Sequence, residues 1–418
     1  MAITFPVIVL LIVLLDVISA WGVRRIYPRF CSRHRRLVRN AFIIQAVLAA
    51  MIVLCGFFLQ HQVRDYRLYA LYAYVFGFIT ALYLPKSLFA AFLFADGIIS
   101  AISLRYRRWF DKFPRDSRRI VANGGFCTSL FFTGLILWGI LFGRYNYTVD
   151  QVEISFTDLP RAFNGYKIVQ ISDIHAGSFA GSARRFQKAV DLINRQEPHL
   201  IVFTGDMVNN FANETDSSIP IFLQLQARDG KYAVLGNHDY GGYFDWDTPS
   251  DSVDNHEALE NAIRQMGFEL LNNQSVIINQ YNTDRIALIG IENWGTGERH
   301  PRRGDLDKAM ESSRDIPFKI LLSHNPVFWS EKVEGKTDIA LTLSGHTHGM
   351  QMGVKLGKRR YGPAPLFHYR HWAGLYRTDN QYLYVNRGLG VIGFPGRIGM
   401  SPEITVITLW KEISPEQP

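Results

Sequence analysis

The sequence predicts an α/β sandwich domain that is preceded by an all-α transmembrane bundle of about four helices. Apolar runs long enough to cross a bilayer are confined to the first third of the chain, whereas short apolar runs alternate with helical patterns beyond residue 165. The charge divides similarly, with 18 Lys and Arg against 6 Asp and Glu up to Asp150 and 27 against 31 beyond it. The basic excess therefore lies among the apolar runs, where it reports membrane topology, and no nucleic-acid partner is expected.

Four apolar runs define the expected bundle. Three of them match the roughly 20 residues that a membrane-spanning helix needs: residues 3–23, 38–60 and 121–143. The fourth run, residues 66–104, is much longer. It either crosses once as a long tilted helix or turns at Pro85 and Lys86 and crosses twice.

Charge favours the single crossing of this long run. The Arg-rich loops at residues 24–39 and 105–119 should both be cytoplasmic under the positive-inside rule. They share a side only if residues 66–104 cross once. Four spans would then place the domain that follows Arg144 outside the cytoplasm, so the chain is expected to be a multi-pass cell-membrane protein with an extracytoplasmic C-terminal domain.

Two carboxylates interrupt the apolar runs. Asp16 and Asp96 are ionisable groups within expected spans, where a transport role has to be considered. Neither belongs to a recognisable ion pathway, and pairing with a neighbouring helix is the simpler interpretation for Asp16. The first third is therefore interpreted as an anchor. All three cysteines also lie there, which excludes a disulfide framework for the rest of the chain.

Short apolar runs predict the strands of the second part. Six of them have the length of buried strands: residues 167–172, 199–204, 231–235, 286–291, 318–323 and 338–344. Helix candidates at residues 183–195 and 255–266 lie between them, and this alternation predicts an α/β sandwich. Two late strands, residues 382–385 and 403–409, are expected to complete one sheet.

Metal-capable side chains directly follow five of these strands. They are Asp173, His175, Asp206, Asn237, His238, His324, His346 and His348. Ligands in open α/β folds collect at the carboxyl ends of strands, so these side chains are expected on one rim. Burying so many without partners would be costly. A mixture of imidazole, carboxylate and amide ligands suits Mn, Fe or Zn, and two ions sharing a bridging carboxylate would use the whole set.

Five ordered motifs carry a family resemblance. They are Asp173-Ile174-His175, Gly205-Asp206, Gly236-Asn237-His238-Asp239, Ser323-His324-Asn325 and Gly345-His346-Thr347-His348. In this order they resemble the calcineurin-like metallophosphoesterase superfamily over about residues 166–409. Gly349-Met350-Gln351 and the sequence Asn-Arg-Gly-Leu-Gly at residues 386–390 are similar to a membrane-associated bacterial branch, which includes phosphodiesterases and some UDP-2,3-diacylglucosamine hydrolases.

The resemblance implies a fold and a division of the chain. The fold is the calcineurin-like metallophosphoesterase β-sandwich flanked by helices. Residues 1–144 would form the transmembrane anchor, residues 145–165 a linker and first strand, and residues 166–418 the metallophosphoesterase domain.

The resemblance also implies roles for individual residues. One metal would be held by Asp173, His175 and His348. The other would be held by Asn237, His324 and His346, with Asp206 bridging the two. His238 would stand near the leaving oxygen as a proton donor or clamp, and Asn237 and His238 would contact substrate.

Two further residues are expected near the chemistry. Many family members have an acidic residue three positions after the bridging Asp, where it orients the catalytic histidine, but this sequence has Asn209 there. An amide can accept the imidazole N–H without stabilising imidazolium by charge. Arg397, which has Gly396 and Gly399 close by in sequence, is a candidate phosphate contact.

The expected activity is that of a membrane-anchored hydrolase with two divalent metal ions, manganese being favoured. The leading hypothesis is a phosphodiesterase that acts on a phosphate ester of a membrane lipid or cell-envelope precursor. Basic and aromatic residues in the stretch 354–377 fit either a cap over such a substrate or a solvated loop. The alternatives are a tethered phosphatase or nucleotide phosphodiesterase for soluble substrates, and a catalytically inactive membrane signalling protein.

Overall fold

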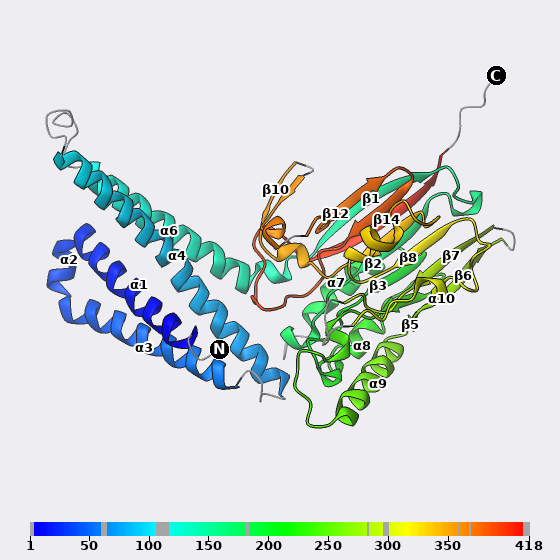
Figure 1. The fold of residues 1–418 in the computed structure, drawn as a ribbon, viewed down its shortest axis with the longest axis horizontal. Helices are drawn as coiled ribbons and strands as arrows, with labels where there is room; N and C mark the ends of the chain where they lie inside the picture. The colour runs from blue at the N-terminus through cyan, green and yellow to red at the C-terminus, as the bar shows by residue number, and fades with distance from the viewer. Residues whose placement is uncertain are drawn as a thin grey trace, which may run out of the picture. The chain divides into compact units, whose positions relative to one another are not determined.

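In the computed structural model the chain forms two compact units, Met1–Arg64 with Leu71–Leu141, and Asp65–Ala70 with Phe142–Pro418. Figure 1 shows the helices of the first and the sheets of the second. The structure describes residues 4–59, 65–105, 117–179, 184–281, 284–295, 301–357, 359–367 and 369–412. Most of the Arg-rich loop expected at residues 105–119 lies outside these residues.

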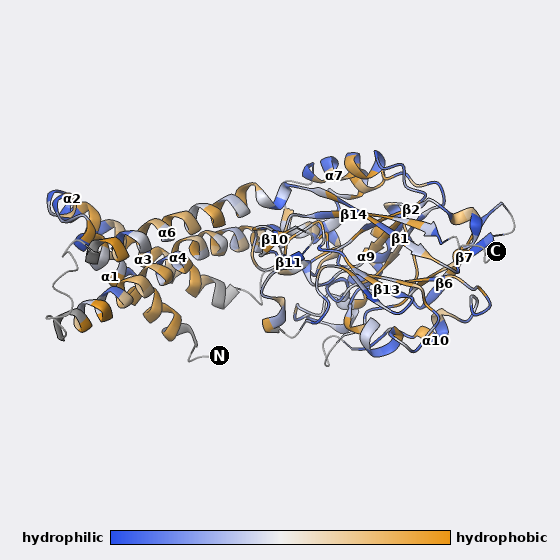
Figure 2. Ribbon diagram, turned by 90° about the horizontal axis from the view of Figure 1, so that it is seen from above, coloured by the Kyte–Doolittle hydropathy of each residue, from blue (hydrophilic) through white to orange (hydrophobic). Residues whose placement is uncertain are grey.

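The first unit consists of helices joined by short connections in its described residues. Its helices are α1 (Thr4–Ile26), α2 (Pro28–Arg33), α3 (Arg35–Leu59), α4 (Tyr66–Arg105) and α6 (Ser117–Leu141). All but α2 are long and apolar enough to cross a membrane, and Figure 2 shows their predominantly hydrophobic colouring. The predicted bundle of about four spans is confirmed.

Helix α4 is continuous where the sequence left a turn open. It runs for 40 residues through Pro85 without a break, so the interpretation with a turn at Pro85 and Lys86 is wrong. Proline removes one helix hydrogen bond but is tolerated in apolar helices that are packed against others. The Ser129 hydroxyl of α6 donates to the Pro85 carbonyl at 2.8 Å. At about 1.5 Å per residue, α4 is on the order of 60 Å long, about twice the hydrocarbon core of a bilayer.

Both carboxylates of the bundle are paired between α1 and α4. Asp16 accepts a hydrogen bond from the Tyr83 hydroxyl at 2.7 Å and forms an ion pair with Lys86. Asp96 pairs with Arg25 at 2.6 Å. These contacts agree with helix pairing, because an ionisable group in an apolar bundle is stabilised by an opposite charge.

The second unit contains two six-stranded sheets and a separate hairpin. The first sheet has the order β1-β14-β2-β3-β4-β5 and consists of β1 (Thr148–Phe156), β2 (Tyr166–Ile171), β3 (Leu200–Thr204), β4 (Lys231–Val234), β5 (Glu269–Leu270) and β14 (Glu403–Lys411). The second has the order β12-β13-β9-β8-β7-β6 and consists of β6 (Gln274–Gln280), β7 (Asp284–Gly290), β8 (Lys319–Leu322), β9 (Leu341–Ser344), β12 (Gly374–Thr378) and β13 (Gln381–Val385). The hairpin is β10 (Val354–Leu356) with β11 (Arg359–Tyr361).

The core follows the two-residue period of the strands. In β2, Ile168 packs between the sheets together with residues of the second sheet such as Ile320. Val169 and Ile171 point to the other face, into a core that includes residues of α7 (Arg185–Asn194), α8 (Ile219–Phe222) and α9 (Pro249–Gln265). A third core covers the outer face of the second sheet. The predicted α/β sandwich with flanking helices is confirmed.

One sheet assignment is wrong. The two late strands do not share a sheet, because β13 pairs in parallel with β9 whereas β14 lies between β1 and β2. The apolar pattern of each strand is set by burial on its own two faces, and this pattern does not distinguish between two sheets that are both buried.

Candidate metal centre

The carboxyl ends of parallel strands from both sheets meet at one rim. In the first sheet β2, β3 and β4 are parallel, and in the second β8 and β9 are parallel. Every predicted metal ligand lies in the loop that directly follows one of these five strands. The chain thus brings together residues that are far apart in sequence, such as His175 and His348, which are 173 positions apart.

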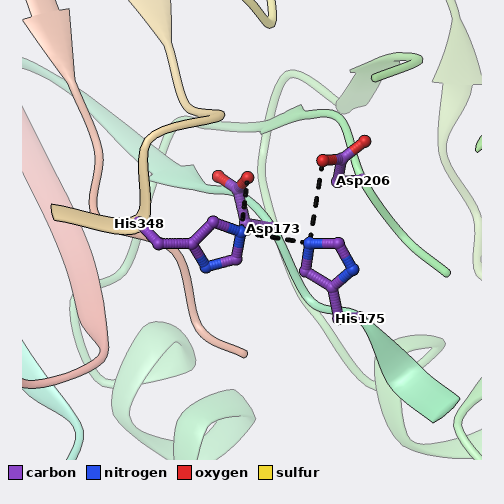
Figure 3. A group of neighbouring side chains, drawn as sticks. All are labelled: Asp173, His175, Asp206 and His348. Carbon is purple, nitrogen blue, oxygen red and sulfur yellow. Dashed lines mark hydrogen bonds and ion pairs between the residues drawn. The ribbon is translucent and has the colours of Figure 1, made fainter. Parts of the chain in front are cut away.

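The first group of ligands consists of Asp173, His175, Asp206 and His348, each with one ligand atom within 4.8 Å of the others. Figure 3 shows these side chains converging; Asp173 and His175 come from the loop after β2, and Asp206 and His348 come from the segments after β3 and β9. The Nε2 atoms of His175 and His348 are 3.0 Å apart. Asp173 Oδ1 lies 3.2 Å from His348 Nε2, and Asp206 Oδ2 lies 3.6 Å from His175 Nε2.

The second group shares Asp206 with the first and adds His324 and His346. His324 Nε2 lies 3.1 Å from Asp206 Oδ2 and 3.2 Å from His346 Nδ1. The Asn237 amide oxygen is also 3.1 Å from His324 Nε2. All seven predicted metal ligands therefore face one another around the Asp206 carboxylate.

Outer hydrogen bonds orient the imidazoles toward this centre. His324 Nδ1 lies 2.7 Å from the Thr204 carbonyl, which can only accept, so Nδ1 carries a proton and Nε2 is the ring nitrogen that faces the centre. His175 Nδ1 lies 3.1 Å from the Asn209 side-chain oxygen and is oriented in the same way. Such partners fix the tautomer that a metal-ligating histidine needs.

The converging atoms fit divalent cations. The close imidazole nitrogens and carboxylate oxygens of the first group are mostly lone-pair donors, which repel one another unless a proton or a cation lies between them. The Asp173, His175 and His348 side chains are at most 5% exposed, so water cannot screen that repulsion. The buried Nδ1 of His348 also has no hydrogen-bond partner among the described residues.

Charges at the centre are unevenly distributed. Burial lowers the pKa of His175 to about 3 and raises that of Asp173 to about 7. Burial also opposes the charged forms of Asp206 and His324, but here the mutual attraction prevails. It holds the pKa of Asp206 well below its usual range and raises that of His324 to about 9.

The loops that carry the ligands have a costly backbone conformation. Five residues without the freedom of glycine have positive φ, namely Asp173 (49°), His175 (46°), Asp206 (62°), His346 (75°) and His348 (53°). Such residues cluster at functional sites, where surrounding structure holds them in place. Neighbouring glycines permit the close approach: a Cβ on Gly345 would lie 1.9 Å from Ser172 Oγ, and one on Gly236 would lie 2.2 Å from Asp206 Oδ1.

His238 lies beside the two groups, oriented by the main chain. Its backbone N–H donates to Asp206 Oδ1 at 2.9 Å, and its ring Nδ1 lies 2.8 Å from the Asn209 carbonyl oxygen. The sequence left the orienting partner of His238 open: Asn209 contacts this ring through its backbone carbonyl, whereas its side-chain amide is turned toward His175. Asp239 does not orient His238 through its carboxylate either, since that group accepts the backbone N–H groups of Asp206, Met207 and Gly236.

Arg397 is not available to a phosphate. It is 1% exposed, and among the described residues its guanidinium donates only to main-chain carbonyls, those of His348, Arg387, Gly388, Gly390 and Met400. The prediction of a phosphate contact is wrong, because its donors are already used to hold the loop after β13 against the loop that carries His348.

Two tyrosines complete the centre, and neither was among the predicted site residues. The Tyr243 hydroxyl accepts a hydrogen bond from the Asn237 amide nitrogen at 2.9 Å, and its ring stacks on His238 with centroids 4.2 Å apart. The Tyr369 hydroxyl lies 3.1 Å from His346 Nε2. Tyr243 is four residues after the Gly236–Asp239 motif, and Tyr369 belongs to the basic and aromatic stretch 354–377, which were the only sequence signals.

Two protein families match the chain. The calcineurin-like phosphoesterase family matches residues 166–350, and a transmembrane domain of calcineurin-like phosphoesterases matches residues 1–144. A transmembrane protein with metallophosphoesterase domain from Danio rerio is 30% identical over 327 residues, which is 76% of this chain and 70% of that protein. The metallophosphoesterase YkuE from Bacillus subtilis is 32% identical over 257 residues, 60% of this chain and 81% of that protein. The chain belongs to the calcineurin-like phosphoesterase family.

One relative of this calcineurin-like phosphoesterase is named for its substrate. The UDP-2,3-diacylglucosamine pyrophosphatase LpxG from Chlamydia trachomatis is 29% identical over 288 residues, 56% of this chain and 81% of that protein. The predicted family and enzyme class are confirmed: the protein is a membrane-associated metallophosphoesterase, a hydrolase of phosphoric esters that uses divalent metal ions.

Proposed function

We propose that this phosphoesterase hydrolyses a phosphodiester of a membrane lipid or cell-envelope precursor at a centre of two divalent cations, with manganese the favoured metal. The observation that carries the proposal is that Asp206 belongs to both ligand groups. A carboxylate with two oxygens can serve two ions at once, and neighbouring ions that share a ligand are the usual arrangement for hydrolytic two-metal sites.

The ligands divide between the two ions by their positions. Asp173, His175 and His348 would hold one ion, and Asn237, His324 and His346 would hold the other, with Asp206 between them. The mixture of nitrogen and oxygen donors suits Mn²⁺, Fe²⁺ or Zn²⁺ better than Ca²⁺. Bound there, the ions would act as Lewis acids on the phosphate and lower the pKa of water.

His238 would assist the leaving group. Burial lowers its pKa, and its Nδ1–H is directed at the Asn209 carbonyl, so the neutral ring presents an unprotonated Nε2. An anionic phosphate beside the ring would raise this pKa by its charge. The resulting imidazolium can stabilise negative charge and donate a proton to the departing oxygen.

A lipid phosphodiester is favoured over a soluble substrate for two reasons. The chain carries a membrane-spanning unit, which holds the catalytic unit close to lipid phosphates. The LpxG relative is named for its action on UDP-2,3-diacylglucosamine, a nucleotide-linked diacyl sugar. We also propose that the catalytic unit is extracytoplasmic, since continuous α4 leaves four candidate spans in the described residues and an even number of crossings.

The proposal is tested with the full chain in proteoliposomes. Hydrolysis of bis-p-nitrophenyl phosphate should disappear after chelation and return with Mn²⁺, and a panel of phospholipids and nucleotide-linked lipids in the vesicles should include a substrate turned over faster than the aryl diester. Activity that survives chelation would contradict the two-metal mechanism. Turnover restricted to soluble esters or nucleotides would contradict the lipid substrate and support the tethered phosphatase.

A further inference from the structure

The β10–β11 hairpin has one face whose apolar side chains are more than half exposed. Its register pairs Val354 with Tyr361 and Leu356 with Arg359, and directly opposed residues of an antiparallel pair share a face. Val354, Leu356 and Tyr361 are 55%, 63% and 51% exposed. In the 3-10 helix that follows (Ala364–Phe367), Leu366 is 80% exposed. We call these residues, with Arg359, the hairpin face.

The other side of the hairpin is attached to the sandwich. Arg360 lies on that side and forms an ion pair with Asp150 of β1. Arg387, which follows β13, pairs with the same carboxylate at 3.2 Å. These buried and half-buried charges orient the hairpin, so the apolar residues are directed away from the sandwich and are not a misplaced piece of its core.

The hairpin is also linked to the metal centre. Ala364, Trp372 and Met400 form a small buried cluster after the hairpin. The Thr347 hydroxyl donates to the Trp372 carbonyl at 2.6 Å, and Thr347 lies between the ligands His346 and His348. The Tyr369 hydroxyl reaches His346 itself. The hairpin face is thus held in a fixed relation to the ligand loop after β9.

Exposed aliphatic residues beside a cation are suited to contact with a lipid surface. Val354, Leu356 and Leu366 have no polar atoms in their side chains, whereas Tyr361 and Arg359 have the polar ends that prefer the headgroup level. The positive charge of Arg359 is attracted to the negative surface of an anionic leaflet.

We propose that the hairpin face docks on the leaflet of a bilayer that contains anionic lipid and so presents the metal centre to phosphodiesters at headgroup level. This inference deepens the proposed function and rests on it for the lipid nature of the substrate. Docking is a physical contact that does not depend on catalysis. An experiment can therefore contradict the docking and leave the proposed activity intact, or contradict the activity and leave the docking intact.

The contact is measured by the quenching of a fluorophore by lipid. The full chain with Cys55→Ala and Cys127→Ala, and with the buried Cys31 retained, receives Val354→Cys and an environment-sensitive label, and is reconstituted with brominated phosphatidylglycerol and phosphatidylcholine. Val253→Cys on α9 is the matched control, because the two valines are 55% and 54% exposed. Quenching at 354 at least severalfold stronger than at 253 is expected, and equal quenching at the two positions would overturn the proposal.

A second measurement separates docking from catalysis. Val354→Gln with Leu356→Gln should lower turnover of a lipid phosphodiester in vesicles by on the order of tenfold, because two aliphatic side chains no longer enter the leaflet. Hydrolysis of bis-p-nitrophenyl phosphate should be unchanged, as should both activities of Val253→Gln. An equal loss on both substrates would overturn the docking role, since it would place the defect in the centre or the fold. If the chain hydrolyses only soluble esters, the quenching result alone decides the proposal.

Discussion

Asp206 is the residue that the two ligand groups of the metal centre share. Its carboxylate contacts ligands of both groups, and its backbone is held at positive φ by hydrogen bonds to the Asp239 carboxylate. The pKa of Asp206 is held well below its usual range by the positive charge of His324, despite the opposing effect of burial. The residue is therefore built to remain an anion in a buried place, which is what a ligand shared by two cations requires.

Asp206→Asn keeps the shape of this side chain and removes its charge. We expect the variant to lose at least one of two bound Mn²⁺ ions and more than about 100-fold in activity, since even outer partners of metal ligands contribute 10- to 100-fold. Metal content by mass spectrometry and aryl diester hydrolysis measure the two effects. Asp307→Asn, at an exposed position in the short helix α10 (Leu306–Ala309), is the control. Full metal content in Asp206→Asn would contradict the shared-ligand assignment.

Tyr243→Phe isolates the hydroxyl that accepts the Asn237 amide. Without it, the amide loses the bond that turns its oxygen toward His324, and we expect Mn²⁺ affinity to fall by about tenfold. The cost in unfolding free energy should stay near 1 kcal/mol, the usual size of one hydrogen bond. Metal titration and thermal unfolding measure these quantities, with Tyr281→Phe, at an 85% exposed position, as the control. Unchanged affinity would remove Tyr243 from the centre.

Arg397→Met tests whether this arginine is structural. Removal of the guanidinium leaves several buried carbonyls without a donor, at about 1–3 kcal/mol for each one that water does not reach. We therefore expect a drop in unfolding free energy of about 3 kcal/mol or more, measured by denaturant titration. A variant of unchanged stability with a raised KM would instead restore the phosphate-contact interpretation.

At the scale of elements, the strand ends position the metal ligands, and glycines allow the ligand loops to lie close to one another. Gly345 directly follows β9, at a place where a side chain would collide with both Ser172 Oγ and Asp173 Oδ2, at 1.9 and 2.4 Å. Gly345→Ala should therefore push the ligand loop away from β2 and lower metal content together with activity. Gly134→Ala in α6, where an added Cβ meets nothing within 4 Å, should change neither. Normal metal content in Gly345→Ala would show that the loop can shift without cost.

The sequence predicted the strands that precede the metal-capable residues, but it did not predict β5, β6, β10, β11 and β12 or the contacts that join distant segments. Lone apolar runs such as 199–204 have the length and burial of strands, and residues placed after such runs must lie at their carboxyl ends. The sheet to which β14 belongs, and the partners of Arg397 and Asn209, depend on contacts between segments far apart in the chain. A guanidinium can donate to carbonyl oxygens as well as to phosphate oxygens, so its chemistry alone did not decide which of them Arg397 contacts.

At the scale of the whole molecule, the continuity of α4 determines the number of membrane crossings and therefore the side on which the catalytic unit is expected. A reporter that is active only in the cytoplasm, fused after Pro418, should stay silent, because the described residues provide four candidate spans and the Arg-rich loops are retained inside. The same reporter inserted after Arg33, between α1 and α3, should be bright. The opposite pattern would place the catalytic unit in the cytoplasm.

The distance along the chain between the ligands has a consequence for biosynthesis. His175 and His348 touch across 173 residues, and the loops that hold them reach their conformation only when both sheets are packed. A nascent chain that has released only β1 to β5 from the ribosome offers neither complete ligand group, because His324, His346 and His348 come later in the chain. The enzyme therefore takes its metal from the compartment in which it folds, and the metal supply of that compartment, rather than intrinsic affinity alone, decides which ion it carries.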